Sequence, residues 1–203
     1  EPRATLVTAL LERAEAGRVT DVSRRELAKL AHPRLAEQLR SWIAESGSGV
    51  WVEKVYTFRR DSYLVEVALE VKNGTAQPLA SHAYFQLARD DKAPAGETAM
   101  MQTFTGAAVY TSEKNFQKIE YSAIEKGKTD YPQQARDGWI GMVQHYFVAA
   151  WLPADKLARE YYTKKQPDGL YSAGLIVATP TIAPGESARV AVPLFSGPQE
   201  QQR

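Results

Sequence analysis

Residues 50–71 read VWVEKVYTFRRDSYLVEVALEV, and this stretch is the strongest indication of the fold class. Apolar and polar side chains alternate from Val50 to Phe58 and again from Tyr63 to Val71. Alternation with a period of two predicts half-buried β-strands, and two such runs around a short polar turn predict an antiparallel hairpin. The Asn73-Gly74 pair that follows predicts a tight turn, because such turns need left-handed backbone.

Further strands are expected along the rest of the chain. The candidates are residues 81–87, 101–110, 117–123, 139–152, 169–178 and 187–194. Pro180, Pro184-Gly185 and Gly197-Pro198 supply turn signals in the last part. So many short strands with regular turn signals favour a mainly β protein, an antiparallel β-sandwich. Residues 138–153 are apolar on both faces, which predicts one strand buried on both sides.

The first 46 residues have a different pattern. Their apolar side chains recur at spacings of three and four, which predicts a helical hairpin or a three-helix segment without chemistry of its own. The expected stripes are Leu6–Ala14, Leu27–Ala31 and Leu35–Ile43. Residues 47–49 then predict a Ser/Gly connector to a β domain that covers residues 50–203.

The composition excludes several classes of function. The chain has 203 residues, 44% of them hydrophobic and 24% charged, which is the balance of a globular protein. A net charge of +1 without a dense Lys/Arg cluster argues against nucleic-acid binding. The absence of cysteine excludes disulfides, and no apolar run is long enough to predict a membrane span. The chain begins at Glu1 without a signal peptide, which fits a processed product or a piece of a larger protein.

Few residues suggest catalysis. The histidines are His32, His82 and His145, and none belongs to a zinc-ligand cluster or accompanies a Gly-x-Ser-x-Gly turn. His145 lies in an apolar run and is expected to be a core residue. The carboxylates on the predicted strands and loops are expected to face solvent. These carboxylates are Glu53, Glu66, Glu70, Glu97 and Glu120. The sequence therefore predicts no catalytic residue, no metal site and no cofactor.

Three motifs resemble the periplasmic domain of YidC-type membrane protein insertases. The first is Val52–Tyr63 with the following Val71–Asn73, and the second is Thr103–Ala108. The third is the long segment Gly138–Pro153, GWIGMVQHYFVAAWLP, and Leu194–Pro198 is similar to the family's final strand. The resemblance covers about Val50–Arg203, whereas Glu1–Glu45 matches no pattern of the family and suggests a fusion or a rebuilt segment.

The resemblance implies a fold, a place and a role. The fold is part of a β-supersandwich with a topology similar to galactose mutarotase, and the place is the periplasmic face of the bacterial inner membrane, within a membrane-anchored parent protein. The role is non-catalytic docking of partners during membrane protein insertion. The implied partners are SecF of the Sec translocon and nascent membrane proteins, with the docking surface expected between Glu70 and Ile124. No catalytic residue carries over from this resemblance.

Two other functions fit the residues. A sugar-binding or mutarotase-like enzyme needs a carboxylate and either His82 or His145 in one cleft, and exposed aromatic side chains could line such a groove. A chimeric scaffold would instead assemble through the helices expected within Leu6–Ile43. Half a supersandwich would also expose apolar sheet and free edges, which favours a homo-oligomer.

Overall fold

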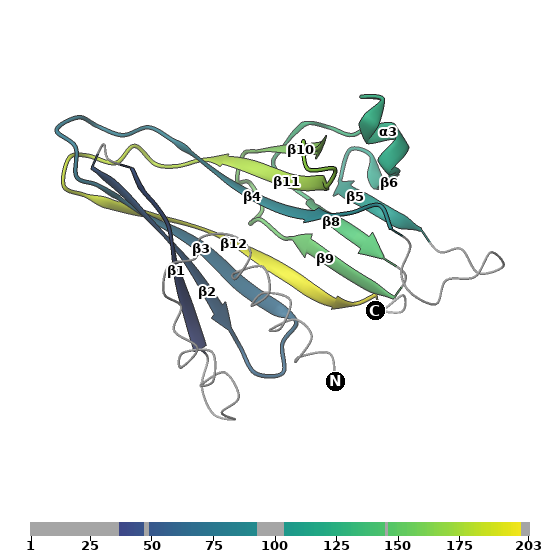
Figure 1. Cartoon of the computed structure of the whole chain (residues 1–203), viewed down its shortest axis with the longest axis horizontal. Coiled ribbons are helices and arrows are strands. Elements are labelled where there is room, and N and C mark those ends of the chain that lie inside the picture. The colour runs from purple at the N-terminus through teal and green to yellow at the C-terminus, as the bar shows by residue number, and fades with distance from the viewer. Residues whose placement is uncertain (1–36, 47–48, 93–103, 145, 200–203) are drawn as a thin grey trace.

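The computed structural model describes residues 49–92, 104–144 and 146–199 in full and residues 37–46 by their backbone. Within these residues, the chain forms two antiparallel sheets (Figure 1). The strands are β1 (Glu37–Ser46), β2 (Val50–Phe58), β3 (Leu64–Asn73), β4 (His82–Arg89), β5 (Thr105–Thr111), β6 (Asn115–Ile119), β7 (Gln134–Ala135), β8 (Trp139–Gln144), β9 (Phe147–Trp151), β10 (Arg159–Lys165), β11 (Tyr171–Ala178) and β12 (Ser187–Pro198). One short helix, α3 (Tyr121–Glu125), follows β6.

The larger sheet has the strand order β1-β2-β3-β12-β9-β8-β5-β6, and the smaller sheet has the order β4-β11-β10-β7. The two sheets pack face to face as a sandwich, with α3 beside β10. The smaller sheet lies over the β12-β9-β8-β5 part of the larger sheet, whereas β1 and β2 extend away from it (Figure 1). The prediction of a mainly β, antiparallel sandwich is therefore confirmed.

The core lies between the two sheets and follows the period of two. Val67, Val192 and Ile140 on the larger sheet and Leu175 on the smaller sheet are fully buried. The ring of Phe85 on β4 packs against the ring of Trp151 on β9, with centroids 5.3 Å apart. Burying each large apolar side chain contributes about 1.5–3 kcal/mol to folding, so this layer is the main source of stability.

The predicted hairpin of residues 50–71 is present. Strands β2 and β3 pair from Val50↔Asn73 to Phe58↔Val65. Asp61, in the polar turn between them, has a φ of +56° and supplies the left-handed backbone of that turn. Short polar residues such as aspartate tolerate this region because their side chains can bond locally.

The predicted role of Asn73-Gly74 is wrong. Neither residue has a positive φ, and the chain passes from β3 in one sheet to β4 in the other instead of forming a hairpin. Asn73 is fully buried, and its amide donates to the carbonyl oxygens of Gln77 and Ile182, each at 2.8 Å. Its Oδ1 accepts from the amide of Thr75 at 3.0 Å. Buried hydrogen bonds and an Asx turn to Thr75, rather than a left-handed hairpin turn, account for this asparagine.

Two predicted strands have a different structure. Residues 139–152 form the hairpin β8–β9, with Gln144 paired to Phe147, instead of one long strand. The apolar run hides this turn because the run contains no Pro, Asn or Asp signal. Residues 117–123 divide between the end of β6 and the start of α3. The sequence pattern also missed β10 and the short β7.

The prediction of a helix over Leu35–Ile43 is wrong for the part that the structure describes. Residues from Glu37 onward form β1, which pairs with β2 from Glu37↔Phe58 to Ser46↔Val50, with an irregularity between Trp42 and Ala44. Pairing with a neighbouring strand has overridden the local helical spacing. The Ser/Gly stretch therefore lies between two paired strands rather than between domains, and Gly49 there has a φ of +83°. The helices expected before residue 37 fall outside the described residues.

Candidate functional site

Among the described residues, the histidine and the carboxylates considered for mutarotase-like chemistry come from different parts of the fold. His82 is exposed at the start of β4, on the smaller sheet, and His32, His145 and Glu97 fall outside the described residues. The strand carboxylates Glu53, Glu66 and Glu70 lie on β2 and β3 of the larger sheet. Glu120 is exposed before α3. His82 and the strand carboxylates therefore lie on different sheets of the sandwich.

Among the residues that the structure describes, Arg159 is the one charged residue that is buried. Its role is structural. Only 4% of its surface is exposed, and its guanidinium donates to five backbone carbonyl oxygens. These belong to Leu157 at 2.8 Å, Gly138 at 3.1 Å, Pro153 at 3.2 Å, Arg136 at 2.9 Å and Ala154 at 2.6 Å. A guanidinium has five N–H donors, so no donor is left over to bind a ligand.

Buried hydroxyl groups nearby are also engaged within the protein. The Tyr161 hydroxyl donates to the carbonyl oxygen of Asp137 at 2.9 Å, and burial raises the pKa of Tyr161 to about 12. The Ser172 hydroxyl donates to the carbonyl oxygen of Lys164 and accepts from the amide of Gln166. A serine held in this way has no adjacent base to activate it, so it is not a nucleophile.

A polar cluster lies where β4, β5, β8 and α3 meet. The Arg89 guanidinium donates to Oε1 of Gln144 at 2.5 Å, and Gln144 pairs with Thr105 across β8 and β5. The Tyr121 ring lies 4.5 Å from the Tyr171 ring, and burial raises the pKa of Tyr121 to about 12. The hydroxyl oxygens of Thr105 and Tyr121 are buried without a hydrogen-bond partner. The cluster is polar, but it includes no histidine among the residues that the structure describes.

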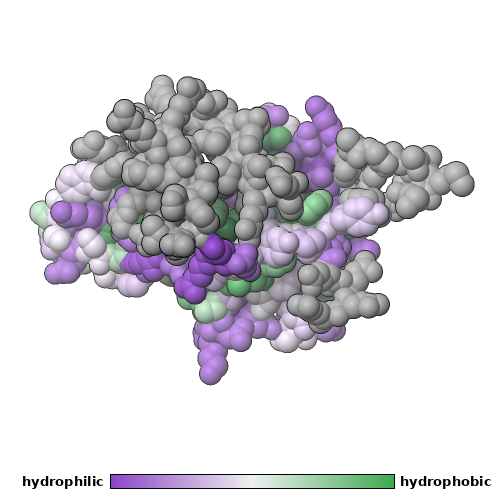
Figure 2. All heavy atoms as spheres, turned by 90° about the horizontal axis from the view of Figure 1, so that it is seen from below, coloured by the Kyte–Doolittle hydropathy of each residue, from purple (hydrophilic) through white to green (hydrophobic). Residues whose placement is uncertain are grey.

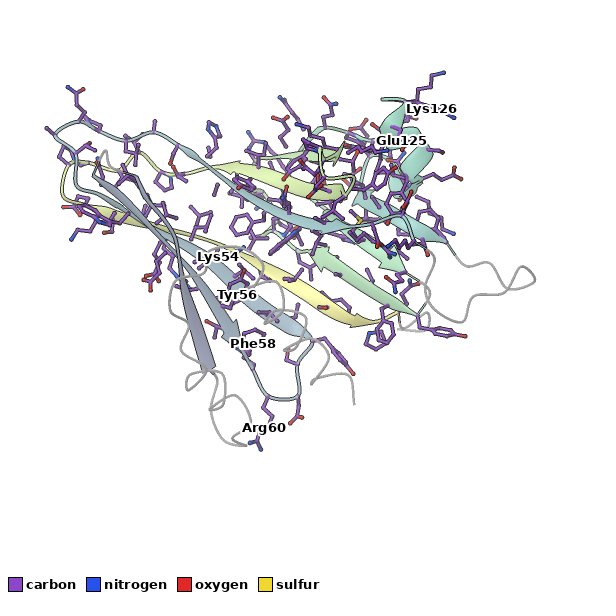
Figure 3. The ribbon with its side chains drawn as sticks, in the orientation of Figure 1. Lys54, Tyr56, Phe58, Arg60, Glu125 and Lys126 are labelled. Atoms are coloured by element: carbon purple, nitrogen blue, oxygen red, sulfur yellow. The ribbon has the colours of Figure 1, made fainter. Side chains whose placement is uncertain are left out.

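A second polar cluster attaches α3 to the smaller sheet. Glu125, at the end of α3 (Figure 3), accepts from Nζ of Lys165 at 2.5 Å and from the hydroxyl of Tyr171. The hydrogen bond from Lys165, and then that from Tyr171, lower the pKa of the Glu125 carboxyl, and the same carboxylate raises the pKa of Lys165. This cluster holds a helix in place and is not a proton-transfer site.

An aromatic patch is the most distinctive exposed feature of the larger sheet. We define it as Tyr110 on β5, Phe116 on β6 and Trp139 on β8, which lie side by side on the face turned away from the core. The Trp139 ring stacks on Tyr110 with centroids 6.4 Å apart and contacts Phe116 at 5.8 Å. Tyr110 is 37% exposed and Phe116 is 48% exposed. Exposed rings that support one another are typical of interaction sites.

Charged groups border the aromatic patch. The Nζ of Lys118 lies 5.3 Å from the centroid of the Phe104 ring. On the other side, the Asp137 carboxylate accepts from the amide of Ser112 at 2.7 Å. Hydrogen bonding by Ser112 lowers the pKa of Asp137, which keeps this carboxyl ionised. The patch is therefore apolar at its centre and carries both signs of charge at its border, as protein interfaces commonly do.

A shallow hollow of about 360 Å³ lies elsewhere on the larger sheet, where β2, β3 and β12 meet. The Lys72 ammonium group lies 5.8 Å from the Trp51 ring at this hollow. Its lining consists of Trp51, Glu53, Glu70, Val71, Lys72 and Ser187. The described residues contain no group of three potential ligands placed to hold a metal ion here or elsewhere. No helix among them has the length and apolar character of a membrane span.

Comparison with known proteins agrees with the resemblance in the sequence. The model of the YidC periplasmic domain family matches residues 37–203, so the family region includes β1 and begins earlier than the predicted Val50. The membrane protein insertase YidC of Nitrosospira multiformis is 52% identical over 155 residues, which are 76% of this chain and 27% of that protein. The YidC of Nitrosomonas europaea is 49% identical over 78% of this chain and 26% of its own length. The chain thus spans about a quarter of these relatives.

Comparison with solved structures agrees with the predicted mutarotase-like fold. A galactose mutarotase related enzyme from Lactobacillus acidophilus superposes with a TM-score of 0.52, covering 84% of this chain and 71% of that chain at 8% identity. Identity this low supports a shared fold and no shared activity. The chain belongs to the YidC periplasmic domain family, as an antiparallel β-sandwich on the periplasmic side of the inner membrane.

Proposed function

We propose that this domain is a docking module, which binds the SecF component of the Sec translocon while its parent protein inserts inner-membrane proteins. The docking surface in this proposal is the aromatic patch with the strand β6, inside the region Glu70–Ile124 except for Trp139. Nascent membrane proteins would contact the same surface only transiently. The exposed, mutually supported rings of Tyr110 and Phe116 are the observation that carries the proposal.

The side chains of the patch suit a protein partner. Aromatic residues dominate the binding energy of many interfaces because they bury a large apolar area and lose little conformational freedom. Trp139 already holds Tyr110 and Phe116 in position, so less freedom is lost when a partner binds. Lys118 is exposed on β6 beside the rings and can pair with an acidic group at the rim of an interface.

The position of the strands supports the same region. β6 is the last strand of the larger sheet and lies between Glu70 and Ile124. A terminal strand has backbone groups on one side that no neighbouring strand of its own sheet pairs with, and partners often use such edges. The docking surface thus combines exposed rings with the free edge of β6.

The test is retention of solubilised SecF-containing translocon on the immobilised chain. We expect the double variant Tyr110→Ser, Phe116→Ser to weaken retention about tenfold or more, since interface rings commonly contribute at least 1.4 kcal/mol together. The matched control is Tyr84→Ser, because Tyr84 is 64% exposed but lies on β4 of the smaller sheet. Full retention by a folded double variant would refute the proposal, as would an equal loss with the control.

A further inference from the structure

A second group of exposed apolar side chains lies at one end of the larger sheet, apart from the aromatic patch. Its members are Tyr63, Leu64, Tyr146 and Phe147, which are 48%, 44%, 62% and 52% exposed. Tyr63 and Tyr146 lie in the β2–β3 and β8–β9 connections, and Leu64 and Phe147 are the first residues of β3 and β9. We call this group the rim.

The rim is continuous because both connections flank the end of β12. Leu64 pairs with Phe195 on one side of β12, and Phe147 pairs with Pro198 on the other side. These two positions on β12 are three residues apart, or about 10 Å along the strand. The amide of Gln199 then donates to the carbonyl oxygen of Tyr146 at 2.6 Å. Residues distant in sequence therefore share one edge of the molecule.

Local packing holds the rim in its exposed position. The Tyr63 ring meets the Phe195 ring edge to face, with centroids 6.1 Å apart. The same ring covers Gly197 so closely that a Cβ there would lie 2.7 Å from a Tyr63 ring carbon. The amide of Ser196 donates to the carbonyl oxygen of Tyr63 at 2.9 Å. The ring is thus fixed on β12 with about half of its surface open to solvent.

Basic side chains extend the rim. Arg59 and Arg60 are both exposed in the β2–β3 turn, and Arg60 projects away from the sandwich (Figure 3). Asp61 is the acidic residue of this turn, so the turn carries an excess of positive charge. Among the residues that Figure 2 draws in colour, hydrophilic and hydrophobic ones lie side by side on the face seen from below. The rim and its turn thus combine exposed apolar side chains with exposed arginines, unlike the apolar centre of a protein interface.

We propose that the rim rests on the surface of an anionic lipid bilayer. Tyrosine rings with an apolar body and a polar tip settle at the boundary between headgroups and acyl chains, and arginines bind the phosphates above it. Phe147 and Leu64 supply apolar contact, and Arg59 and Arg60 supply attraction to negative headgroups. The family places this domain beside the inner membrane, so a bilayer is within reach of such an edge. The proposal does not depend on the docking role of the aromatic patch.

The first experiment is co-sedimentation of the whole chain with vesicles of phosphatidylethanolamine and phosphatidylglycerol. We expect binding that weakens as salt is raised and that falls about fivefold or more with Phe147→Ser and Leu64→Ser together. Arg59→Gln with Arg60→Gln should remove the preference over vesicles of phosphatidylcholine. Tyr84→Ser, at an exposed ring far from the rim in sequence and on the other sheet, should bind as the unmodified chain does.

The second experiment locates the contact and replaces only one rim side chain at a time. The chain has no cysteine, so Phe147→Cys and Tyr84→Cys can each be labelled at one position with an environment-sensitive fluorophore. With the same anionic vesicles, we expect a blue shift and brighter emission only from the label at position 147. No binding of the unmodified chain, or equal responses from the two labels, would overturn the proposal.

Discussion

The Arg159 guanidinium donates a hydrogen bond to the carbonyl oxygen of Gly138 at 3.1 Å, which joins the start of β10 to the residue before β8. Gly138 has a φ of +80°, and the guanidinium also binds Pro153, just after β9. Both ends of the apolar Gly138–Pro153 segment are thus tied to one buried cation. This arrangement explains why the β8–β9 hairpin keeps its place under the smaller sheet.

Replacing Arg159 should destabilise the fold strongly. Arg159→Met removes five donors and leaves buried carbonyl oxygens without partners, so we expect the free energy of unfolding to fall by about 3 kcal/mol. Urea denaturation followed by circular dichroism measures this change. Arg136→Met is the control, because Arg136 is exposed and its loss should cost about 0.5 kcal/mol or less. Equal stability of the two variants would contradict the structural role of Arg159.

Gly138 should not tolerate a side chain. In Gly138→Ala the new Cβ would lie 1.8 Å from the carbonyl oxygen of Tyr110, so the backbone of β5 or β8 must shift. Gly169→Ala is the matched control, because Gly169 has a φ of +84° and no atom within 4 Å of the added Cβ. The control should cost about 1–2 kcal/mol from backbone strain alone. Thermal unfolding should show a much larger loss for Gly138→Ala, and similar losses would mean that no clash occurs.

Asn73 should require an amide rather than a carboxylate. Its Nδ2 donates to the carbonyl oxygens of Gln77 and Ile182, so Asn73→Asp would set a carboxylate oxygen against two carbonyl oxygens. We expect a loss of about 2–3 kcal/mol, measured by chemical denaturation at neutral pH. The control Asn115→Asp changes an exposed asparagine and should leave stability nearly unchanged. A neutral effect at Asn73 would show that its amide bonds are dispensable.

The attachment of α3 should depend on pH in a defined direction. Hydrogen bonds from Lys165 and Tyr171 lower the pKa of Glu125 in the folded state. Because the pKa of Glu125 is lower in the folded chain than in the unfolded chain, the ionised carboxylate stabilises the fold at any pH above its pKa in the unfolded chain. This stabilisation is lost as the pH falls through the pKa of Glu125 in the folded chain. Glu125→Gln should therefore lower the melting temperature at neutral pH. The difference in melting temperature from the unmodified chain should shrink when the pH falls below the ordinary pKa of a glutamate side chain. A difference that is constant with pH would exclude this ionic contribution.

The sequence pattern predicted most of the β architecture, because alternation records which side chains face a core. It predicted the β2–β3 hairpin and the final strand, whose pairing partners were then observed. It failed at β1, where pairing with β2 overrides a helical spacing, and at the β8–β9 turn, where no turn residue marks the reversal. It also failed at Asn73, because the burial of a side-chain amide at the end of β3 leaves no periodic signal in the sequence.

The sequence by itself determined the mainly β class and the family, since both depend on local alternation and on one long motif, Gly138–Pro153. Only the tertiary structure decided which exposed side chains form surfaces. Tyr110 and Trp139 are far apart along the chain and stack because β5 pairs with β8. Tyr63 and Phe147 share a rim because both flank β12. The order in which distant strands pair depends on the side-chain burial of both whole sheets taken together. A short stretch of sequence does not contain that information.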